Sequence, residues 1–416
     1  MADSRHAPTR TTLRADVAVI GGGIIGLGIA HEARRLGRSV VLIDPAPASG
    51  ATFAAAGMLA PVSELHYQEE DLLDLMVESS RLWPGFINSI GGATGYRTTP
   101  TLAVGADAAD RRALADLRLV QVAAGLGVEP LGLREARTRE PLLSPGISSA
   151  FEIPADHHVD PRQLAARLMK ILSAHSTSEA SWVEEAAAGF SVADTAVRLL
   201  WDHSRVAGVE LGSGTVVHAA ETVVANGLGA ASLQGLPSGL ALPLRPVYGD
   251  ILRLRVPEHL RPLATSTVRG LVRGVPVYIV PRDDGTVVIG ATQREDGLSA
   301  SSNAVSAGGV YQLLRDAQAL VPAVAELELL EATARARPGT PDNAPLLGRI
   351  GSPGGYVRGL LIATGFFRHG VLLTPVAAKI MCGLMEGHDD PRWSLFRPDR
   401  FNDTLNHHHL RGKETA

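Results

Sequence analysis

The sequence contains one cysteine, Cys382, in 416 residues. A single cysteine excludes an internal disulfide and a zinc site built from several thiolates. No segment approaches the ~18 uninterrupted apolar residues of a membrane-spanning helix, and residues 1–14 lack the apolar run of a secretory signal. Neither charge sign dominates: 39 Lys and Arg stand against 43 Asp and Glu, which argues against nucleic acid or an anionic membrane as the main partner. We therefore expect a cytoplasmic protein that acts on small molecules.

The stretch from Val17 to Asp44 has the pattern of a strand, a glycine turn, a helix and a second strand. Gly21, Gly23 and Gly26 have the G-x-G-x-x-G spacing, which permits a tight turn, the approach of a pyrophosphate, and close packing of helix on strand. Asp44 follows at roughly the 20 positions at which an acid reaches a ribose hydroxyl pair. The unit predicts a dinucleotide site. Alone it also fits an NAD-dependent dehydrogenase, or a glycine-rich turn in an ordinary α/β fold.

The rest of the chain alternates between helical and strand patterns. Residues 45–61 are rich in small side chains, which suit either a flat ligand lying against the backbone or a plain loop with a short helix. The pattern from Pro243 to Gly290 is typical of an antiparallel sheet. Helices are predicted over residues 71–90, 111–124, 161–172, 305–320 and 370–385. The predicted fold class combines α/β and α+β structure.

Further motifs follow the dinucleotide unit. The segment AAAGML covers residues 54–59, VYIVPR contains Tyr278, ARARPGTPDNAPLLGR contains Arg337, and LLIATGFFRHGVLLTP contains Arg368. With these motifs in this order over nearly its whole length, the chain resembles the flavin-dependent amine oxidases of the D-amino-acid oxidase superfamily, and within it the glycine oxidases of thiamine biosynthesis. The ordered set is much more specific than any one motif.

The resemblance implies FAD as the cofactor, bound non-covalently, because no cysteine lies near Arg335, where some relatives tether the flavin. It also implies a discontinuous Rossmann-like FAD-binding domain with an inserted antiparallel-sheet substrate-binding domain. The FAD-binding domain is expected to comprise residues 14–90, 155–237 and 335–400, the substrate-binding domain residues 91–154 and 238–334, and the flexible tails residues 1–13 and 401–416.

The resemblance also implies which residues contact FAD. The expected contacts are Gly21, Gly23, Ile24, Ile25, Gly26, Asp44, Ala51, Thr52, Ala56, Gly57, Met58, Phe366, Phe367, Arg368, His369, Gly370, Val371 and Leu372. Of these, residues 56–58 would contact the flavin ring. The run 366–372 would border its pyrimidine, where helix N–H groups can stabilise the negative charge that develops on reduction.

For the substrate, chemistry independent of the family gives the same roles as the resemblance. An α-amino acid must present its Cα hydrogen to the flavin N5, and its carboxylate is the group that can fix it. By resemblance, Arg337 is the guanidinium fork that binds this carboxylate, Arg368 is a second candidate, and Tyr278 donates a hydroxyl bond. Taken singly, each arginine is more simply interpreted as a surface ion pair. No catalytic residue beyond the flavin is expected, and no metal.

The reaction implied is the oxidative deamination of glycine and related small amines, such as sarcosine and short D-amino acids. Hydride passes to the flavin N5 and O2 is reduced to H2O2. The expected partners are this amino acid and O2, a thiazole synthase that uses the product, and further copies of the chain in a homotetramer. The alternatives are an FAD-dependent D-amino acid or proline dehydrogenase with another electron acceptor, and a flavin-binding subunit without turnover. Pro276 and Gln293 replace a histidine and a methionine of some glycine oxidases, which leaves the preferred amine open.

Overall fold

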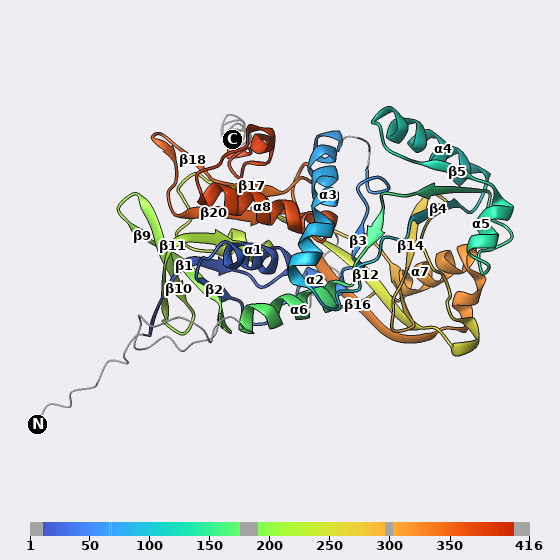
Figure 1. The fold of residues 1–416 in the computed structure, drawn as a ribbon, viewed down its shortest axis with the longest axis horizontal. Helices are drawn as coiled ribbons and strands as arrows, with labels where there is room; N and C mark the ends of the chain where they lie inside the picture. Colours follow the sequence, from blue (N-terminus) through green and yellow to red (C-terminus); the bar gives the residue numbers. More distant parts are fainter. Residues whose placement is uncertain (1–10, 66, 68, 175–189, 296–302, 403–416) are drawn as a thin grey trace, which may run out of the picture.

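The computed structural model describes residues 11–65, 67, 69–174, 190–295 and 303–402. Its strands form two large sheets that lie beside each other along the long axis of the molecule (Figure 1). The helices of the described residues are α1 (Ile24–Arg35), α2 (Ala51–Ala54), α3 (Leu73–Ile90), α4 (Ala108–Ala123), α5 (Leu133–Arg139), α6 (Pro161–Ala174), α7 (Ala307–Leu320) and α8 (Thr374–Met385). The short 3-10 helices are η1 (Glu70–Leu72), η3 (Gly227–Ser232), η4 (Glu258–Leu260), η5 (Pro322–Glu326), η6 (Phe367–His369) and η7 (Pro391–Phe396).

The first sheet has the order β17-β20-β11-β1-β2-β8, with β10 and β9 added beside β11. Its strands are β1 (Thr12–Ile20), β2 (Val40–Ile43), β8 (Ser191–Val192), β9 (Ala196–Asp202), β10 (Arg205–Leu211), β11 (Val216–Val224), β17 (Leu346–Gly348) and β20 (Leu360–Thr364). β1 runs parallel to β2 and β11. Val17 and Val19 pack with α1 and α8 on one face, and Ala18 and Ile20 face a second core on the other. Both faces of β1 are buried, as expected of a parallel strand inside an α/β layer.

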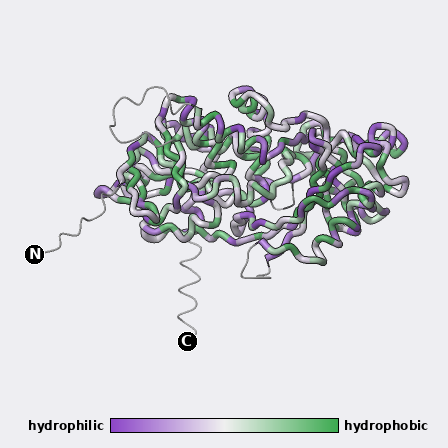
Figure 2. The backbone as a smooth tube through the Cα atoms, turned by 90° about the horizontal axis from the view of Figure 1, so that it is seen from below, coloured by the Kyte–Doolittle hydropathy of each residue, from purple (hydrophilic) through white to green (hydrophobic). Residues whose placement is uncertain are grey.

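The second sheet has the order β16-β12-β15-β14-β13-β4-β6-β5. Its strands are β4 (Thr101–Gly105), β5 (Glu129–Leu131), β6 (Ser149–Ile153), β12 (Arg245–Arg255), β13 (Thr267–Val272), β14 (Val275–Pro281), β15 (Thr286–Gly290) and β16 (Glu328–Gly339). The small pairs are β3 (Met58–Leu59) with β7 (His157–His158), and β18 (Gly351–Ser352) with β19 (Gly355–Tyr356). α7 packs on this sheet through Leu313, Ala317 and Leu320. Hydrophobic segments run through the interior of both halves of the molecule (Figure 2).

The fold class predicted from the sequence is confirmed, with local corrections. The second sheet is antiparallel except where β13 runs parallel to β4. α4 begins at Ala108 because Asp107 caps it in a capping box with Asp110. α8 begins at Thr374, after the 3-10 turn of residues 367–369. β1 begins at Thr12, inside the predicted tail 1–13; residues 1–10 and 403–416 lie outside the described residues.

The strands of each sheet come from separate parts of the chain. The second sheet draws on residues 101–153 and 245–339, and the first sheet on residues before, between and after them. β16 crosses the boundary predicted at residue 335 and carries Arg337 near its end. The exact domain boundaries remain a prediction.

Candidate active site

A cavity of about 510 Å³ is lined by segments of both halves of the molecule. Its volume is typical of small-molecule sites, which occupy roughly 300–1,000 Å³. Every residue predicted to contact cofactor or substrate lines this cavity except Gly26. These lining residues are Gly21, Gly23, Ile24, Ile25, Asp44, Ala51, Thr52, Ala56, Gly57, Met58, Tyr278, Arg337, Phe366, Phe367, Arg368, His369, Gly370, Val371 and Leu372.

The glycines of the opening motif shape one end of the cavity. A Cβ at Gly26 would lie 1.9 Å from the Gly21 carbonyl oxygen, so glycine lets α1 pack against the end of β1. Gly21 has φ +107° and leaves no room for a side chain, since its Cβ would lie 2.5 Å from Ala225 O. At Gly23 a Cβ would meet only Thr52 Oγ1, at 3.5 Å. The missing side chain of Gly23 therefore leaves open space where a pyrophosphate can approach the backbone.

Polar groups at this end suit the nucleotide part of FAD. The first turn of α1 borders the cavity, and helix N-termini present N–H groups that favour a phosphate. Ile24 N donates to Thr52 Oγ1 at 3.0 Å. Asp44 accepts hydrogen bonds from Gly22 N at 2.6 Å and from Ala46 N at 2.8 Å, and its carboxylate retains lone pairs for ribose hydroxyls. These donors, this acceptor and the space at Gly23 fit the nucleotide.

The small-residue stretch forms one wall of the cavity. The predicted short helix is present, because residues 51–54 form α2, and residues 54–58 line the cavity, which leaves their predicted contact with a flat ligand as a prediction. Gly57 has φ +79°, and a Cβ there would lie 2.0 Å from Val159 O. Gly57 O in turn accepts a hydrogen bond from Val159 N at 2.9 Å. The backbone of this wall therefore packs directly against Val159, two residues before α6 begins.

A second wall is formed by residues 366–372. Leu372 O accepts hydrogen bonds from Trp83 Nε1 at 2.9 Å and from Ser79 Oγ at 2.6 Å, so α3 anchors the end of this segment. Phe367 has φ +46° at the start of η6. The sequence predicted helical N–H groups here. Since α8 begins only at Thr374, the N–H groups that border the cavity belong to η6 and to the turn that follows it.

Arg337 lies at the other end of the cavity. Its guanidinium lies over the backbone of β12, where a Cβ at Gly249 would be 2.2 Å from Arg337 Nη1. Glycine at position 249 therefore makes room for this side chain. No hydrogen bond or ion pair joins the Arg337 guanidinium to any residue that the structure describes. Its charge and its planar donor fork are available to a ligand.

Tyr278 lines the same end of the cavity from β14. Its hydroxyl has space because residue 290 is glycine: a Cβ there would lie 2.4 Å from Tyr278 OH. Burial raises the pKa of Tyr278 to about 12, although nearby Arg337 acts in the opposite direction. At neutral pH the hydroxyl is therefore protonated and can donate a hydrogen bond.

Arg368 also lines the cavity, but unlike Arg337 its guanidinium is paired with carboxylates. Its Nη2 donates to Glu69, and its Nε lies 3.0 Å from Glu64 Oε2. Arg269 of β13 donates to the other oxygen of Glu64. The two carboxylates and two guanidiniums form a balanced buried network, so Arg368 differs from Arg337 in having its charge already matched. The sequence predicted both as holders of the substrate carboxylate, and the geometry favours Arg337 alone.

The sequence interpretation did not include Glu64 or Arg269, although both line the cavity. Burial alone would raise the pKa of Glu64, but Arg269 and Arg368 hold it well below its usual range. Asp156 fixes the loop before Glu64, because it accepts hydrogen bonds at 2.9 Å from Val62 N and from Ser63 N. One available signal was a charged residue inside the apolar strand pattern at Arg269, which lies opposite Tyr278 in the sheet.

Other predicted features have these positions. Pro276 and Gln293 line the cavity, and both residues are exposed, so they lie toward its opening. Cys382 is buried in α8 and is not among the lining residues. Within the described part of the chain, no group of three or more His, Cys, Asp or Glu side chains could hold a metal ion. Across the same residues, no helix combines the length and apolar character needed to span a bilayer.

Comparison with known proteins now places the chain. Residues 16–384 match the model of the FAD dependent oxidoreductase family, DAO. The chain belongs to this family. The predicted family, the FAD cofactor and the predicted enzyme class, an FAD-dependent amine oxidoreductase, are thereby confirmed, and the residues described above fit the cofactor.

Individual relatives agree with this placement. The chain is 32% identical to the glycine oxidase of Geobacillus kaustophilus over 386 residues, which cover 90% of this chain and 94% of that protein. A crystal structure of glycine oxidase from Geobacillus kaustophilus superposes with a TM-score of 0.78 at 29% identity, covering 93% of this chain and 99% of that one. The chain is also 30% identical to the bifunctional protein ThiO/ThiG of Trichormus variabilis over 396 residues. It aligns with 93% of its own length but spans only about half, 55%, of that relative.

Proposed function

We propose that this FAD-dependent oxidoreductase deaminates glycine and related small amines, among them sarcosine and short D-amino acids, with O2 as the electron acceptor. The observation that carries the proposal is the Arg337 guanidinium, which borders the cavity with no partner among the described residues, beside the protonated hydroxyl of Tyr278. A carboxylate is the ligand that best matches such a planar fork. The likeness to glycine oxidase supports the same substrate class.

Charge in the cavity supports a substrate with a single carboxylate. Arg269 and Arg368 are matched by Glu64 and Glu69, which leaves the charge of Arg337 to be compensated by the ligand. A second carboxylate on the substrate could pair with Arg269 or Arg368 only by displacing one of these buried acids. Breaking a buried ion pair is strongly unfavourable, by about 3–5 kcal/mol. Small mono-carboxylate amines are therefore the proposed class.

The residues of this chain position the substrate. Arg337 binds the carboxylate in a bidentate manner, and the Tyr278 hydroxyl donates a further hydrogen bond, so that the Cα hydrogen is directed along the cavity toward Ala56–Met58. When bound, FAD supplies the two-electron acceptor for the Cα hydride, the nitrogen loses a proton to give the imino acid, and O2 takes up two electrons and two protons to give H2O2. The protein contributes orientation, since no side-chain nucleophile or metal is required.

A relative in Rhizobium etli, the putative thiamine biosynthesis oxidoreductase ThiO, supports a functional link between this reaction and thiamine biosynthesis. We propose that the imino product is used by a thiazole synthase, and that the chain acts in the cytoplasm as a homotetramer. Co-elution with a thiazole synthase tests the partner, and light scattering tests the oligomeric state.

A substrate panel tests the proposal. Purified protein reconstituted with FAD is given glycine, sarcosine, D-alanine and D-proline in air, and peroxide is measured. Glycine or sarcosine should give stoichiometric peroxide and imino acid. Reduction of an artificial dye without peroxide would instead identify a dehydrogenase. Persistence of the yellow oxidised flavin with every amine under anaerobic conditions would identify a flavin-binding subunit without turnover.

A further inference from the structure

The wall formed by residues 53–59 is held by side chains from other elements. We call it the 53–59 segment. Phe53 and Ala56 each offer a backbone carbonyl to arginine side chains rather than to backbone donors. Carbonyls left free by such an irregular segment must find donors, because an unsatisfied buried carbonyl is unfavourable. The donors therefore determine where this wall stands.

Arg282 makes the central contact. It directly follows β14, and its side chain is only 2% exposed. Its Nη2 donates to Ala56 O, and its Nη1 donates to Val159 O at 3.2 Å. Its Nε lies 3.6 Å from Asp160 Oδ2. One planar guanidinium thus joins the 53–59 segment, the start of α6, and the strand that carries Tyr278 four positions earlier.

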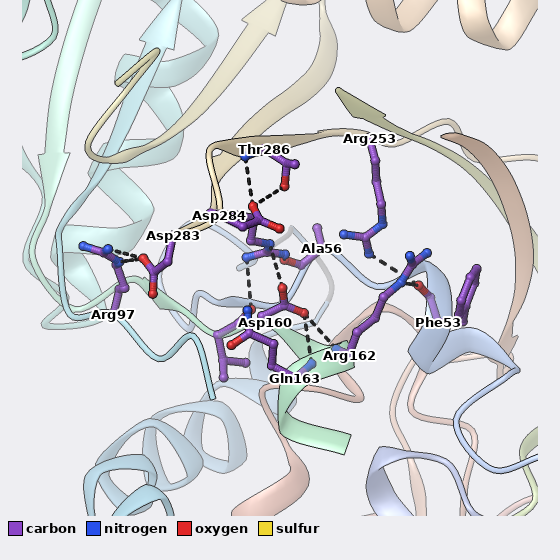
Figure 3. Close-up of polar contacts among 12 residues, drawn as sticks. Phe53, Ala56, Arg97, Asp160, Arg162, Gln163, Arg253, Asp283, Asp284 and Thr286 are labelled. Carbon is purple, nitrogen blue, oxygen red and sulfur yellow. Dashed lines mark hydrogen bonds and ion pairs between the residues drawn. The ribbon is translucent and has the colours of Figure 1, made fainter. Parts of the chain in front are cut away.

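Arg162 and Arg253 hold the other end of the segment. Arg162 Nε donates to Phe53 O at 2.9 Å, and Arg253 Nη2 donates to the same oxygen at 3.4 Å. Figure 3 shows both side chains directed toward Phe53, with Arg253 coming from above and Arg162 from below. Arg162 is also paired with Glu331 of β16 at 2.7 Å. Strands of the second sheet are therefore connected to both ends of the wall.

Burying the charged guanidiniums of Arg282 and Arg253 carries a desolvation cost. Burial lowers the pKa of Arg282 to about 10, with nearby Asp160 acting against this, and burial also lowers the pKa of Arg253. Asp160 itself caps α6, since its Oδ1 accepts from Arg162 N at 2.9 Å and from Gln163 N at 3.3 Å. Apolar residues would fill this space with less desolvation. An apolar residue at position 282 could not donate hydrogen bonds to the carbonyl oxygens of Ala56 and Val159.

We propose that Arg282 is a positioning residue that sets the distance between the Ala56–Met58 wall and Tyr278, and thereby the place of the flavin ring between them. The proposal rests on the proposed placement of the ring against residues 56–58. Arg282 is not among the residues that line the cavity. It acts through the Ala56 carbonyl on one side and through β14 on the other.

The test measures the flavin and needs no amine. Arg282→Met keeps the bulk of the side chain and removes both carbonyl contacts. We expect FAD to bind at least about tenfold more weakly, as follows from losing charge-assisted hydrogen bonds, and the visible absorption band of the bound flavin to shift. Arg282→Lys keeps the charge but lacks the fork, and should show a smaller change of the same kind. FAD affinity and the flavin spectrum are measured without an amine, so they test the role of Arg282 even if none of the amines in the substrate panel is oxidised.

A matched control is Arg97→Met. Arg97 pairs with Asp283, the residue after Arg282, yet its guanidinium makes no contact with the 53–59 segment within the described residues. Its FAD affinity and flavin spectrum should match the wild type.

The variant Arg282→Met/Asp160→Asn separates positioning from charge balance. Asparagine keeps the cap on α6, and the double variant leaves no buried unpaired carboxylate. We expect its unfolding midpoint to recover toward the wild type while the weaker FAD binding and the spectral shift persist. Recovery of the wild-type affinity and spectrum would mean that Arg282 only balances Asp160, and would overturn the proposal. Unchanged FAD affinity and spectrum in Arg282→Met would overturn it directly.

Discussion

The two ends of the cavity are built in opposite ways. At the nucleotide end, the wall is largely made of glycines, alanines and backbone N–H groups of residues 21–25 and 44–58, with the side chains of Asp44 and Thr52 among them. At the substrate end, the wall consists of charged side chains from distant elements, including Arg269, Arg337 and Arg368. Backbone groups can bind a cofactor that is the same for a whole family. A substrate is selected by individual charged side chains. An arginine that gains or loses a carboxylate partner within the protein changes whether its guanidinium is available to a ligand.

Arg337 and Arg368 show this most clearly. Both line the cavity, but Arg368 is held by Glu64 and Glu69, and Arg337 lies beside Gly249 with no partner among the described residues. An arginine that already has two carboxylates stabilises the wall, and an arginine without one can bind a ligand. Variants at these positions should therefore have different effects.

The largest effect is expected for Arg337→Ala. Removing the fork deletes two charge-assisted bonds to the substrate carboxylate, so KM for glycine should rise about 1,000-fold while FAD stays bound. Steady-state kinetics and the flavin absorption of the purified variant measure both quantities. Arg337→Lys keeps the charge without the planar fork and should recover part of the loss. An unchanged KM would remove Arg337 from the substrate site.

Arg368→Met should act on stability more than on binding. The change leaves Glu64 and Glu69 buried with one arginine fewer, and should lower the free energy of unfolding by about 3 kcal/mol. Denaturant unfolding measures this loss. Adding Glu69→Gln should restore part of it, and KM for glycine should change much less than in Arg337→Ala. A KM change as large as that of Arg337→Ala would show that both arginines bind the carboxylate.

Buried His158 should make the stability of the protein depend on pH. His158 is buried on β7 beside Met58, and burial lowers its pKa from 6.5 to about 3. Because the unfolded state binds the proton first, this stability is present above pH 6.5 and is lost as pH falls toward 3, by about 2 kcal/mol at pH 5. Unfolding curves between pH 5 and 7 measure the slope. Burial raises the pKa of Asp156 to about 6, which gives a slope of opposite sign in this range, so the contribution of His158 is the difference between the wild type and His158→Gln; His203→Gln, at an exposed position, should leave the wild-type slope unchanged.

The smallest effect is expected at the nucleotide end, for Gly23→Ala. The added methyl group has room in the protein but enters the space left for the pyrophosphate, so FAD should bind about tenfold more weakly at unchanged apoprotein stability. Fluorescence titration of the apoprotein measures the affinity. Gly85→Ala is the control, since a Cβ there meets nothing within 4 Å. Equal FAD affinity in both variants would show that the cofactor does not approach Gly23.

The nucleotide end could be predicted from the sequence because its contacts are local. Gly26 packs against Gly21, and Asp44 accepts a hydrogen bond from Gly22 N, all within one strand-helix-strand unit whose spacing can be read from the sequence. The alternation of helical and strand patterns indicated both kinds of sheet, and the family resemblance implied how the two domains are assembled. The parallel pairing of β13 with β4 could not be predicted, because it joins strands from two separate parts of the chain.

The substrate end could be predicted only in part. The motifs pointed to Tyr278, Arg337 and Arg368, and all three line the cavity. Which arginine is free depends on Glu64 and Glu69, which lie between β3 and α3 and pair with Arg368 about 300 positions later in the chain. Sequence spacing carries no information about such a pairing. Arg282 is the last residue of the motif VYIVPR, yet its proposed role follows only from its hydrogen bonds to the carbonyl oxygens of Val159 and Ala56.

A crystal structure of the FAD-loaded protein with glycolate, a carboxylate analogue of glycine that lacks the amine, tests the central claim most directly. The carboxylate should lie within hydrogen-bond distance of both terminal nitrogens of Arg337 and of the Tyr278 hydroxyl, with Arg368 still paired to Glu64 and Glu69. Glycolate bound to Arg368, with Arg337 left without a ligand, would contradict the account.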